Sequence, residues 1–448
     1  MASTYLHSNT GTATNAKKFT LSMWIKRGSL CGGTSQRFYQ GYKDSNDRFY
    51  VMFDSGTADT LWIYAVSSGT TQVYWTSSRR FRDTNGWYNF VFSADSTQAS
   101  QGDRFKVYVN GVEETAWTKN NNPSQDIDWG NQLAQSNNDL TISGTETQTQ
   151  LFDGSMSHIH FIDGTAYDAT AFGSFDNDTG EWKINTSPSV TYGNNGYFIL
   201  KDGNSVTDSS PNSNDFSVGA GTLTNTEDNP SNVFATLNPL TGNCTFSNGN
   251  NTWVGTTSGY EHSSATLGAS SGKYYWEVKP TNSCGAMGIT DFNWQFDKRG
   301  SIIYASSGYA WVYEGNGYVS HETYGDIATN YSSYTSSDII GVALDLDNNK
   351  LYFHKNGTYE NSGDPTSGAT GTGAISIDAP SSLPSGFYSP LVADLCGASA
   401  GGGSVNFGNG YFGTTQISSE GTNASGYGKF EYDVPTVYTA LCTKGLNE

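Results

Sequence analysis

Apolar side chains occupy every second position in many short segments of this chain, and this period restricts what the chain can fold into. In residues 19–28, FTLSMWIKRG, the residues Phe19, Leu21, Met23 and Ile25 all fall on one side. A period of two places alternate side chains on opposite faces of a β-strand, whereas a helix needs a period near 3.6. Further segments of this kind follow at short intervals, so the pattern predicts half-buried strands in an antiparallel sandwich.

The composition agrees with a β fold of more than one domain. Aromatic residues make up 14% of the 448 residues, charged residues only 15%, and 52 glycines supply turns. We therefore predict an all-β chain with two antiparallel jelly-roll or lectin-like β-sandwiches in tandem, joined by an irregular connector. The sandwiches are expected at 17–166 and 239–433, the connector with a few strands at 167–238, and tails at 1–16 and 434–448.

Charge and cysteine content narrow the function classes. A net charge of −19 with only 23 Lys and Arg argues against a nucleic-acid partner, because phosphate binding needs clustered cations. No apolar run is long enough to predict a signal peptide or insertion into a membrane. Five cysteines without metal-type spacing predict small, unpaired thiols and no disulfide framework.

An Asn-Gly turn occurs at equivalent places in the two halves. RFKVYVNGVEE at 104–114 and KLYFHKNGTYE at 350–360 each follow an apolar strand that contains an Asp. Asn-Gly favours tight hairpins because both central residues take positive φ. The recurrence indicates the same layer architecture twice, or the chance repetition of a common hairpin.

Several segments also resemble known families. The second half resembles SPRY (B30.2-type) domains through SGKYYWEV, DIIGVALDLDNNKLYFHKNG, FYSPLVADL and GGSVNFG, in that order. The first half resembles laminin G-like, concanavalin A-like domains through FTLSMWIKRG, WYNFVFSADST, DRFKVYVNGVEE and FDGSMSHIHFIDGTAYD. The pair, with the joining phrases FGSFDNDTGEWK and ATLNPL, resembles structural, tail-fibre-like proteins of phages that infect marine bacteria. The resemblance implies recognition scaffolds on a virion and names no ligand.

Catalytic motifs are weak in this chain. Residues 268–272 fit G-x-S-x-G and 408–413 fit G-x-G-x-x-G, but neither opens the helix that those motifs require. Polysaccharide hydrolysis needs paired carboxylates on one strand face. Glu113 and Glu114 are adjacent, and Glu277 has no acidic residue two or four positions away. We therefore predict that the protein is not an enzyme.

Two candidate metal sites are present in the sequence. His158 and His160 share one side of a predicted strand, which is expected to be its solvent side. No cofactor is expected to be required, and calcium is the ion that the sequence favours. In DNDTGE, Asp176, Asp178 and Glu181 offer the hard oxygen ligands that calcium prefers. The same residues also fit an ordinary Asx turn.

Exposed aromatic rings are the ligand signal in the first half, because a flat apolar ring stacks on a sugar while nearby polar groups bind its hydroxyls. In LWIYAV, alternation predicts that Trp62 and Tyr64 point away from the core. Tyr74 in the next strand would extend this patch, with Asn89 and Asp95 as hydrogen-bonding partners. Alternatively, the rings pack under a loop or against the other domain.

The second half concentrates aromatic residues between positions 294 and 334. SPRY-like domains recognise partners through loops at one sheet edge, so the resemblance points to Tyr318 and Tyr324 as ligand-binding residues. Trp311 and Tyr313 alternate within a probable strand, and core packing is expected for one of them.

Three functions follow as hypotheses. The first is a virion surface or appendage protein that recognises a host glycan or envelope protein, made in the host cytoplasm and presented as a homo-oligomer beside other virion subunits. An extracellular protein is the alternative location. The second is a purely structural capsid decoration or fibre adaptor. The third is a polysaccharide depolymerase.

Overall fold

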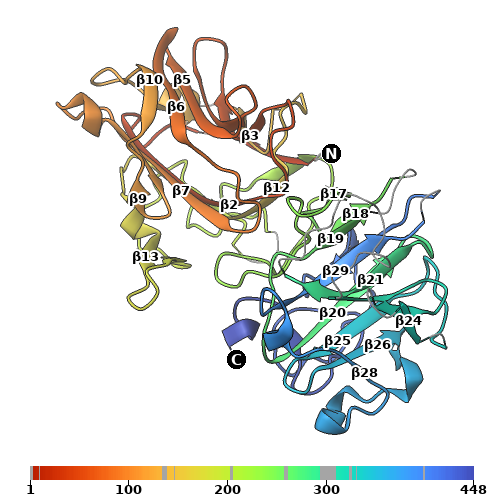
Figure 1. The fold of residues 1–448 in the computed structure, drawn as a ribbon. Helices are drawn as coiled ribbons and strands as arrows, with labels where there is room; N and C mark the ends of the chain where they lie inside the picture. Colours follow the sequence, from red (N-terminus) through yellow and green to blue (C-terminus); the bar gives the residue numbers. More distant parts are fainter. Residues whose placement is uncertain are drawn as a thin grey trace. The chain divides into compact units, whose positions relative to one another are not determined.

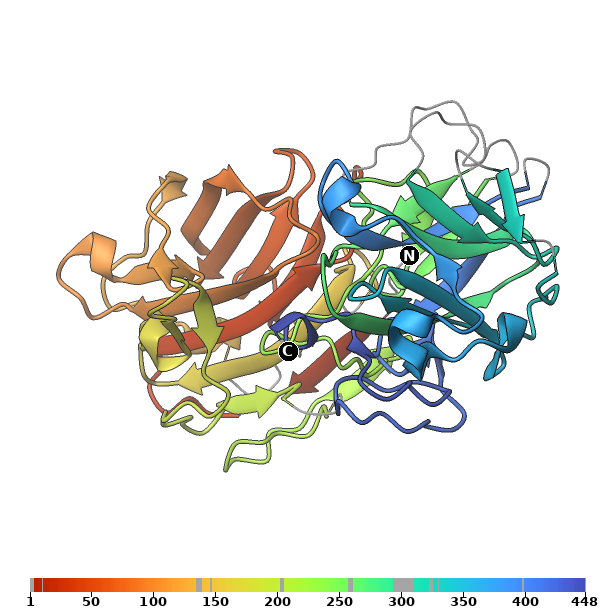
Figure 2. The same ribbon diagram turned by 60° about the horizontal axis from the view of Figure 1, so that its bottom comes forward.

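The computed structural model folds into two compact units, Met1–Thr224 and Asn225–Glu448. Each unit contains two packed β-sheets, which can be followed by colour in Figures 1 and 2. This architecture confirms the predicted all-β class with two sandwiches in tandem. No described helix is long and apolar enough to cross a membrane. The structure describes residues 4–447 except 10, 134–138, 146, 202–204, 257–260, 293–308, 322–324, 329 and 397–398.

The first unit pairs an eight-stranded sheet with a six-stranded sheet. The larger sheet has the order β10 (Trp117–Asn121), β6 (Thr70–Arg80), β5 (Thr60–Ser67), β4 (Arg48–Asp54), β3 (Gln36–Tyr42), β11 (Asp139–Ile142), β1 (Tyr5–Asn9), β16 (Ser217–Ala220). The smaller has the order β15 (Tyr197–Ile199), β12 (Gly154–Asp163), β2 (Lys18–Arg27), β7 (Trp87–Asp95), β8 (Phe105–Val109), β9 (Val112–Glu113). Outside these sheets lie the hairpin β13 (Gly173–Phe175) and β14 (Trp182–Ile184), α1 (Gly130–Leu133) and short 3-10 helices at Gln101–Asp103 and Ala169–Ala171.

The core of the first unit lies between these sheets. Alternate residues of β2, such as Leu21 and Met23, meet alternate residues of β4 and β5, such as Val51 and Ile63, and all four are fully buried. The N-terminal segment adds β1 to the larger sheet, and the predicted connector supplies β15 and β16. These segments therefore belong to the first sandwich, because they complete its two sheets.

The outer face of the six-stranded sheet is covered by the segment at 165–192. Thr20 Oγ1 donates to Thr165 O (2.9 Å), and Trp182 Nε1 donates to Asn89 Oδ1 (3.1 Å). The prediction that β2 is only half buried is wrong for this reason. The placement of His158 and His160 on a solvent face is also wrong, because both are buried.

The two histidines are held by aromatic neighbours on that covered face. His160 stacks on Phe198 with ring centroids 3.9 Å apart, and its Nδ1 lies 2.9 Å from Tyr192 Oη. Burial lowers the pKa of His160 well below its usual range. His158 has φ +47° where the pairing register of β12 shifts. His160 is therefore a packed, neutral side chain, and His158 is a buried residue at a β-bulge.

The second unit is built from a nine-stranded and a six-stranded sheet. The first contains β17 (Thr245–Ser247), β18 (Thr252–Val254), β30 (Gly402–Asn406), β20 (Lys273–Pro280), β25 (Ile340–Asp345), β26 (Lys350–Lys355), β27 (Thr358–Tyr359), β28 (Ile375–Ser376) and β33 (Thr439–Ala440). The second has the order β19 (His262–Ser264), β29 (Tyr388–Asp394), β21 (Gly285–Asp291), β22 (Ala310–Tyr313), β23 (Val319–His321), β24 (Gly325–Ala328). The remaining elements are the hairpin β31 (Tyr411–Phe412) and β32 (Thr415–Gln416), and short 3-10 helices at Glu360–Ser362, Pro365–Thr370, Pro380–Ser382 and Gly445–Asn447.

The C-terminal segment covers the outer face of the nine-stranded sheet. Tyr275 and Tyr352 point outward from this sheet and are buried in a cluster with Phe430, Val434 and Tyr438. β33 also pairs with β20. The predicted tail at 434–448 is therefore a structural layer, because these outward-facing rings need an apolar cover.

The buried side chain of Glu277 holds the C-terminal segment against this sheet through hydrogen bonds. Its carboxylate accepts hydrogen bonds from the backbone N–H of Glu431 (2.9 Å) and Tyr432 (2.8 Å), and from the side chains of Asn406 (3.2 Å) and Tyr275 (3.0 Å). Burial raises the pKa of Glu277 to about 7, although these donors oppose the shift. The group is therefore a buried anchor for the C-terminal segment.

Both Asn-Gly hairpins form as predicted, and their surroundings match. Asn110 and Asn356 have φ near +50°, and each side-chain oxygen accepts the backbone N–H at the start of the neighbouring strand, from Asn89 (2.7 Å) and Ile339 (2.8 Å). In both units an aromatic ring covers the following glycine: Trp182 covers Gly111, and Tyr432 covers Gly357. Since a Cβ would collide with either ring, glycine is required by φ and by space.

The cysteine prediction is wrong in one respect. Cys284, before β21, and Cys396, after β29, form a disulfide across 112 residues of sequence. The two strands are adjacent in their sheet, so their ends meet although the cysteines are far apart in sequence. Cys31 and Cys442 are buried thiols, as expected.

Removal of this disulfide is expected to destabilise the second unit alone. Cys284→Ser with Cys396→Ser should lower its free energy of unfolding by about 2–4 kcal/mol, because the crosslink restricts the unfolded chain. Differential scanning calorimetry should show the unfolding transition of the second unit moving to a lower temperature, while the transition of the first unit stays constant. Cys244→Ser, which removes a free thiol, is the control. Titration of five thiols in denaturant without reductant would contradict the assignment.

Glu277 is expected to make the second unit less stable as pH rises. Its pKa is higher in the folded protein (about 7) than the ordinary 4.5, so folding favours the protonated form. This contribution is fully present below about pH 4.5 and is lost by about pH 7, a difference of about 3 kcal/mol. His354 and His262, whose pKa values burial lowers from 6.5 to about 3 and about 2, stay neutral in the folded protein but become charged below about pH 6.5 when it unfolds. They contribute a slope of opposite sign, so the contribution of Glu277 is the difference between the wild type and Glu277→Gln.

The measurement is urea unfolding of the second unit at several pH values. The free energy of unfolding of Glu277→Gln should be lower than that of the wild type at low pH. It should also lack the part of the pH dependence that comes from Glu277. Glu113→Gln, a change at an exposed acid of the first unit, should leave the profile unchanged. An identical slope in the wild type and Glu277→Gln would show that Glu277 does not titrate in this range.

Candidate functional site

Four aromatic side chains gather on the outer face of the eight-stranded sheet. Tyr50 lies on β4, Trp62 and Tyr64 on β5, and Tyr74 on β6. The direct cross-strand pairs Tyr50–Tyr64 and Tyr64–Tyr74 place them side by side, and contacting ring centroids are 5.2 to 6.1 Å apart. We call these four residues the aromatic face.

The aromatic face has the orientation that the sequence predicts for Trp62, Tyr64 and Tyr74. Their strand neighbours Leu61 and Ile63 are fully buried, whereas the four rings are half-buried. Each ring therefore keeps a solvent-accessible part. A cluster of amphipathic rings on a rigid sheet is suited to stacking against the apolar face of a flat ligand.

Two arginines lie on the aromatic face. The Cζ atom of Arg37, on β3, is 4.0 Å from the ring centre of Tyr50, and that of Arg48, on β4, is 5.3 Å from that of Tyr64. Arg37 donates to the side chains of Gln40 and Gln150, whereas Arg48 makes one long hydrogen bond of 3.5 Å to Tyr64 Oη. Among the described residues, neither guanidinium has a carboxylate within 4 Å.

Several donors on this face have no acceptor in the described part of the chain. They are the Nε atoms of Arg37 and Arg48 and the indole Nε1 of Trp62, all of which are buried. Tyr64 Oη lies 3.4 Å from Thr71 Oγ1, and the hydrogen bonds with Thr71 and Arg48 lower the pKa of Tyr64. The face therefore offers apolar rings, hydroxyls and cationic donors.

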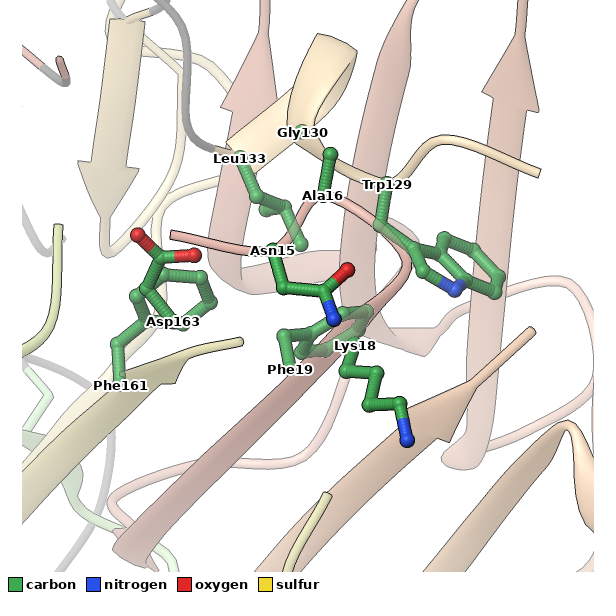
Figure 3. Close-up of a pocket in the computed structure, with 9 residues that line it drawn as sticks. All are labelled: Asn15, Ala16, Lys18, Phe19, Trp129, Gly130, Leu133, Phe161 and Asp163. Atoms are coloured by element: carbon green, nitrogen blue, oxygen red, sulfur yellow. The ribbon is translucent and has the colours of Figure 1, made fainter. Parts of the chain in front are cut away.

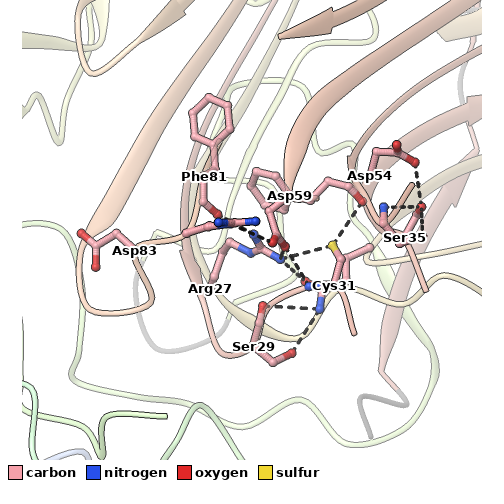
Figure 4. Close-up of polar contacts among 12 residues, drawn as sticks. Arg27, Ser29, Cys31, Ser35, Asp54, Asp59, Phe81 and Asp83 are labelled. Atoms are coloured by element: carbon pink, nitrogen blue, oxygen red, sulfur yellow. Dashed lines mark hydrogen bonds and ion pairs between the residues drawn. The ribbon is translucent and has the colours of Figure 1, made fainter. Parts of the chain in front are cut away.

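A third arginine of the same unit shows a contrasting arrangement (Figure 4). Arg27 at the end of β2 is buried, and its Nη2 lies 3.0 Å from Asp59 Oδ1. Asp59 also accepts the backbone N–H of Cys31 (2.8 Å), and burial raises the pKa of the Cys31 thiol to about 11. This network ties loops together and holds no reactive thiolate, so its role is structural.

Asn89 and Asp95 do not join the aromatic face. Both lie on β7 of the other sheet. The side chain of Asn89 is bound to Trp182, and that of Asp95 to Lys18, Thr97 and Gln98. This part of the prediction is wrong, because β7 follows β6 in sequence but crosses to the six-stranded sheet.

In the second unit most of the described aromatic residues between positions 309 and 334 belong to the core. Trp311 and Tyr313 are both buried in it, so the expectation that only one of them packs inside is wrong. Tyr318 is 37% exposed in the turn between β22 and β23. Tyr324 lies outside the described residues. The structure therefore brings together no second aromatic site from the described members of this stretch.

The predicted calcium ligands lie in the turn between β13 and β14. Asp176 accepts the backbone N–H of Thr179 (2.8 Å) and of Asp178 (3.1 Å), and it pairs with Lys183 at 2.7 Å. Within the described residues, no group of three His, Cys, Asp or Glu side chains is arranged to hold a metal ion. The side chain of Asp176 therefore closes an Asx turn that contains Asp178 and is followed by Glu181, and the geometry gives the calcium prediction no support.

A small pocket lies in the first unit beside the start of β2 (Figure 3). It encloses about 170 Å³, part of it open to solvent, and Trp129, Phe19 and Phe161 line it together with Asp163. Asp163 Oδ2 accepts the backbone N–H groups of Thr14 (2.8 Å) and Asn195 (3.1 Å). Its enclosed cavity volume is only about 10 Å³, room for about one water molecule, so this pocket is a less suitable site than the aromatic face.

The acids considered for hydrolysis have other roles. Glu277 is buried beneath the C-terminal layer, and Glu113 lies 3.8 Å from the ammonium group of Lys106. Glu114 accepts the backbone N–H of Ala116. These positions give the depolymerase hypothesis no support.

Three members of the site were missed at the sequence level: Tyr50, Arg37 and Arg48. In RFYVMFD, alternation places Arg48 and Tyr50 on the same side, opposite Phe49 and Val51. This signal was available. The pairing of β3, β4 and β5, which brings these side chains to the rings of Trp62 and Tyr64, is set only by the sheet.

Comparison with known proteins gives a match for the first unit. Residues 1–170 match the family model of the concanavalin A-like lectin/glucanases superfamily. A search of the curated proteins found no match.

Solved structures with similar regions include the SPRY domain of human HERC1 (18% identity, 38% of this chain and 96% of that one, TM-score 0.30). They also include a heptameric SAP-like pentraxin from Limulus polyphemus (12% identity, 37% and 78%, TM-score 0.25). A third is domain 4 of the arabinanase AbnA from Geobacillus stearothermophilus, solved with arabinotriose (18% identity, 34% and 64%, TM-score 0.24). The family match at residues 1–170 gives the first unit a laminin G-like, concanavalin A-like lectin fold.

Proposed function

We propose that this protein is a non-enzymatic binding protein that recognises a glycan through the aromatic face of its first unit. The observation that carries the proposal is the cluster of Tyr50, Trp62, Tyr64 and Tyr74, four half-buried rings in mutual contact on the outer face of a sheet. Sugar rings present an apolar C–H face that stacks on aromatic rings, while hydroxyls and cations bind the sugar's oxygens.

The difference between the two units supports this reading. On the nine-stranded sheet of the second unit, the outward rings of Tyr275 and Tyr352 are fully covered by the C-terminal segment. On the eight-stranded sheet of the first unit, the outward rings stay half-exposed. Exposed rings cost free energy in water, so their retention on a rigid sheet favours an interaction surface.

We further propose that the protein acts at a virion surface, as an appendage of the tail-fibre or receptor-binding type whose partner is a host glycan. The support is the resemblance of both halves to phage structural proteins and the low affinity of single glycan contacts, which homo-oligomeric display would raise by avidity. The Cys284–Cys396 disulfide is compatible with an oxidising exterior.

Loss of the central ring should weaken glycan binding. Trp62→Ala is expected to weaken the affinity about tenfold or more, about 1.4 kcal/mol or more, because Trp62 contacts the other three rings of the face. The measurement is binding to an array of oligosaccharides, followed by titration calorimetry with the strongest ligand. Phe175→Ala removes a more exposed ring of the same unit and should change nothing.

Equal binding by the wild type and Trp62→Ala would exclude the aromatic face as the glycan site. The same ligands also test catalysis, because reducing ends should not accumulate during long incubation with the protein. Their release would instead support the depolymerase hypothesis.

A further inference from the structure

The aromatic face contains two guanidinium groups that have no anionic partner within the described residues. Arg37 and Arg48 are half-buried beside Tyr50 and Tyr64. Elsewhere in the same unit, the buried Arg27 pairs with Asp59 at 3.0 Å. Arg104, also buried, donates to three backbone carbonyls at 2.8 to 3.0 Å.

The lack of a carboxylate is unexpected in this chain. Asp and Glu number 42 against 23 Lys and Arg, so acidic partners are abundant in the sequence. Burial lowers the pKa of Arg37; Tyr50 opposes this shift, and the positive charge of Arg48 adds to it. An anion placed between them would relieve this repulsion, because opposite charges attract strongly where burial excludes water.

The available donors fit a planar or tetrahedral oxyanion. Arg48 makes one long hydrogen bond, from Nη2 to Tyr64 Oη (3.5 Å), and the rest of its guanidinium has no acceptor in the described part of the chain. A guanidinium presents its N–H groups as a fork that matches a carboxylate or sulfate. Tyr74, on β6, contacts the rings of both Trp62 and Tyr64 on β5. The rings available for stacking and the two arginines therefore form one continuous surface.

We propose that the aromatic face is selective for acidic glycans, with Arg37 and Arg48 binding a carboxylate or sulfate of a sugar whose ring stacks on Trp62 and Tyr64. This inference rests on the proposed glycan-binding function and adds the ligand class. Nucleic acid also combines rings with negative charge, but its repeated phosphates need a longer track of cations than two arginines provide.

The decisive comparison uses ligands that differ only in charge. An oligogalacturonate is compared with the same oligosaccharide after its carboxyl groups are reduced to alcohols, and a sulfated oligosaccharide of equal length is the third arm. We expect the acidic forms to bind at least about tenfold more tightly than the reduced form. A preference for one acidic arm identifies carboxylate or sulfate as the group bound. Their affinity should fall as NaCl is raised from about 50 mM to about 500 mM, because salt screens partly exposed charges.

Variants separate this inference from the proposed function. Arg48→Gln and Arg37→Gln should remove the preference, so that acidic and reduced ligands bind with equal affinity, whereas Trp62→Ala should weaken all arms and keep the preference. Arg48→Lys, which keeps the charge without the fork, should retain part of the preference and serves if a glutamine variant does not fold. Arg79→Gln, at an exposed arginine near Phe81, is the control.

Each of the other outcomes contradicts the acidic preference, the role of the arginines or both proposals. Equal affinity for acidic and reduced ligands, still sensitive to Trp62→Ala, would overturn the acidic preference and keep glycan binding. An unchanged preference in Arg48→Gln with lowered thermal stability would show that the arginine only supports the rings. Binding of a single-stranded oligonucleotide in preference to every glycan, or no glycan binding at all, would overturn both proposals.

Discussion

The first unit depends on the packing of its two sheets through a single apolar interior. Residues such as Phe49, Val51 and Ile63 are completely buried there, and each large side chain contributes roughly 1.5–3 kcal/mol on burial. Because side chains alternate along a strand, this burial also forces Tyr50 and Tyr64 onto the outer face. A register shift of one residue would put these rings inside and the core residues outside. The constraint that stabilises the sandwich therefore also builds the aromatic face.

Whether the outer face of a sheet can contact a ligand depends on the segment that covers it. The segment at 165–192 covers the six-stranded sheet of the first unit, and the C-terminal segment covers the nine-stranded sheet of the second. In both places outward polar groups become buried and find partners: Asn89 binds Trp182, and Glu277 binds the backbone of the covering segment. The rings on β4, β5 and β6 have only part of their surface covered, which leaves them able to contact a ligand.

Local charge at the aromatic face differs in sign from the chain as a whole. The net charge of −19 would repel an acidic ligand at long range, but at physiological salt such repulsion is screened beyond about 8 Å. At contact distance Arg37 and Arg48 dominate, since they lie directly over Tyr50 and Tyr64. An acidic chain can therefore contain a cationic site, provided that few carboxylates lie near it.

The sequence by itself determined the β class, the two sandwiches, both Asn-Gly hairpins and the outward orientation of Trp62 and Tyr64, because these depend on local φ preferences and on a period of two. Only the tertiary structure decided the features that need distant segments to meet. Cys284 and Cys396 join because β21 and β29 are adjacent. His158 and His160 are buried because a later segment covers their face, and Arg48 joins Tyr64 because β4 and β5 pair in that register. Alternation specifies two faces of a strand, but it does not specify what will lie against each of them.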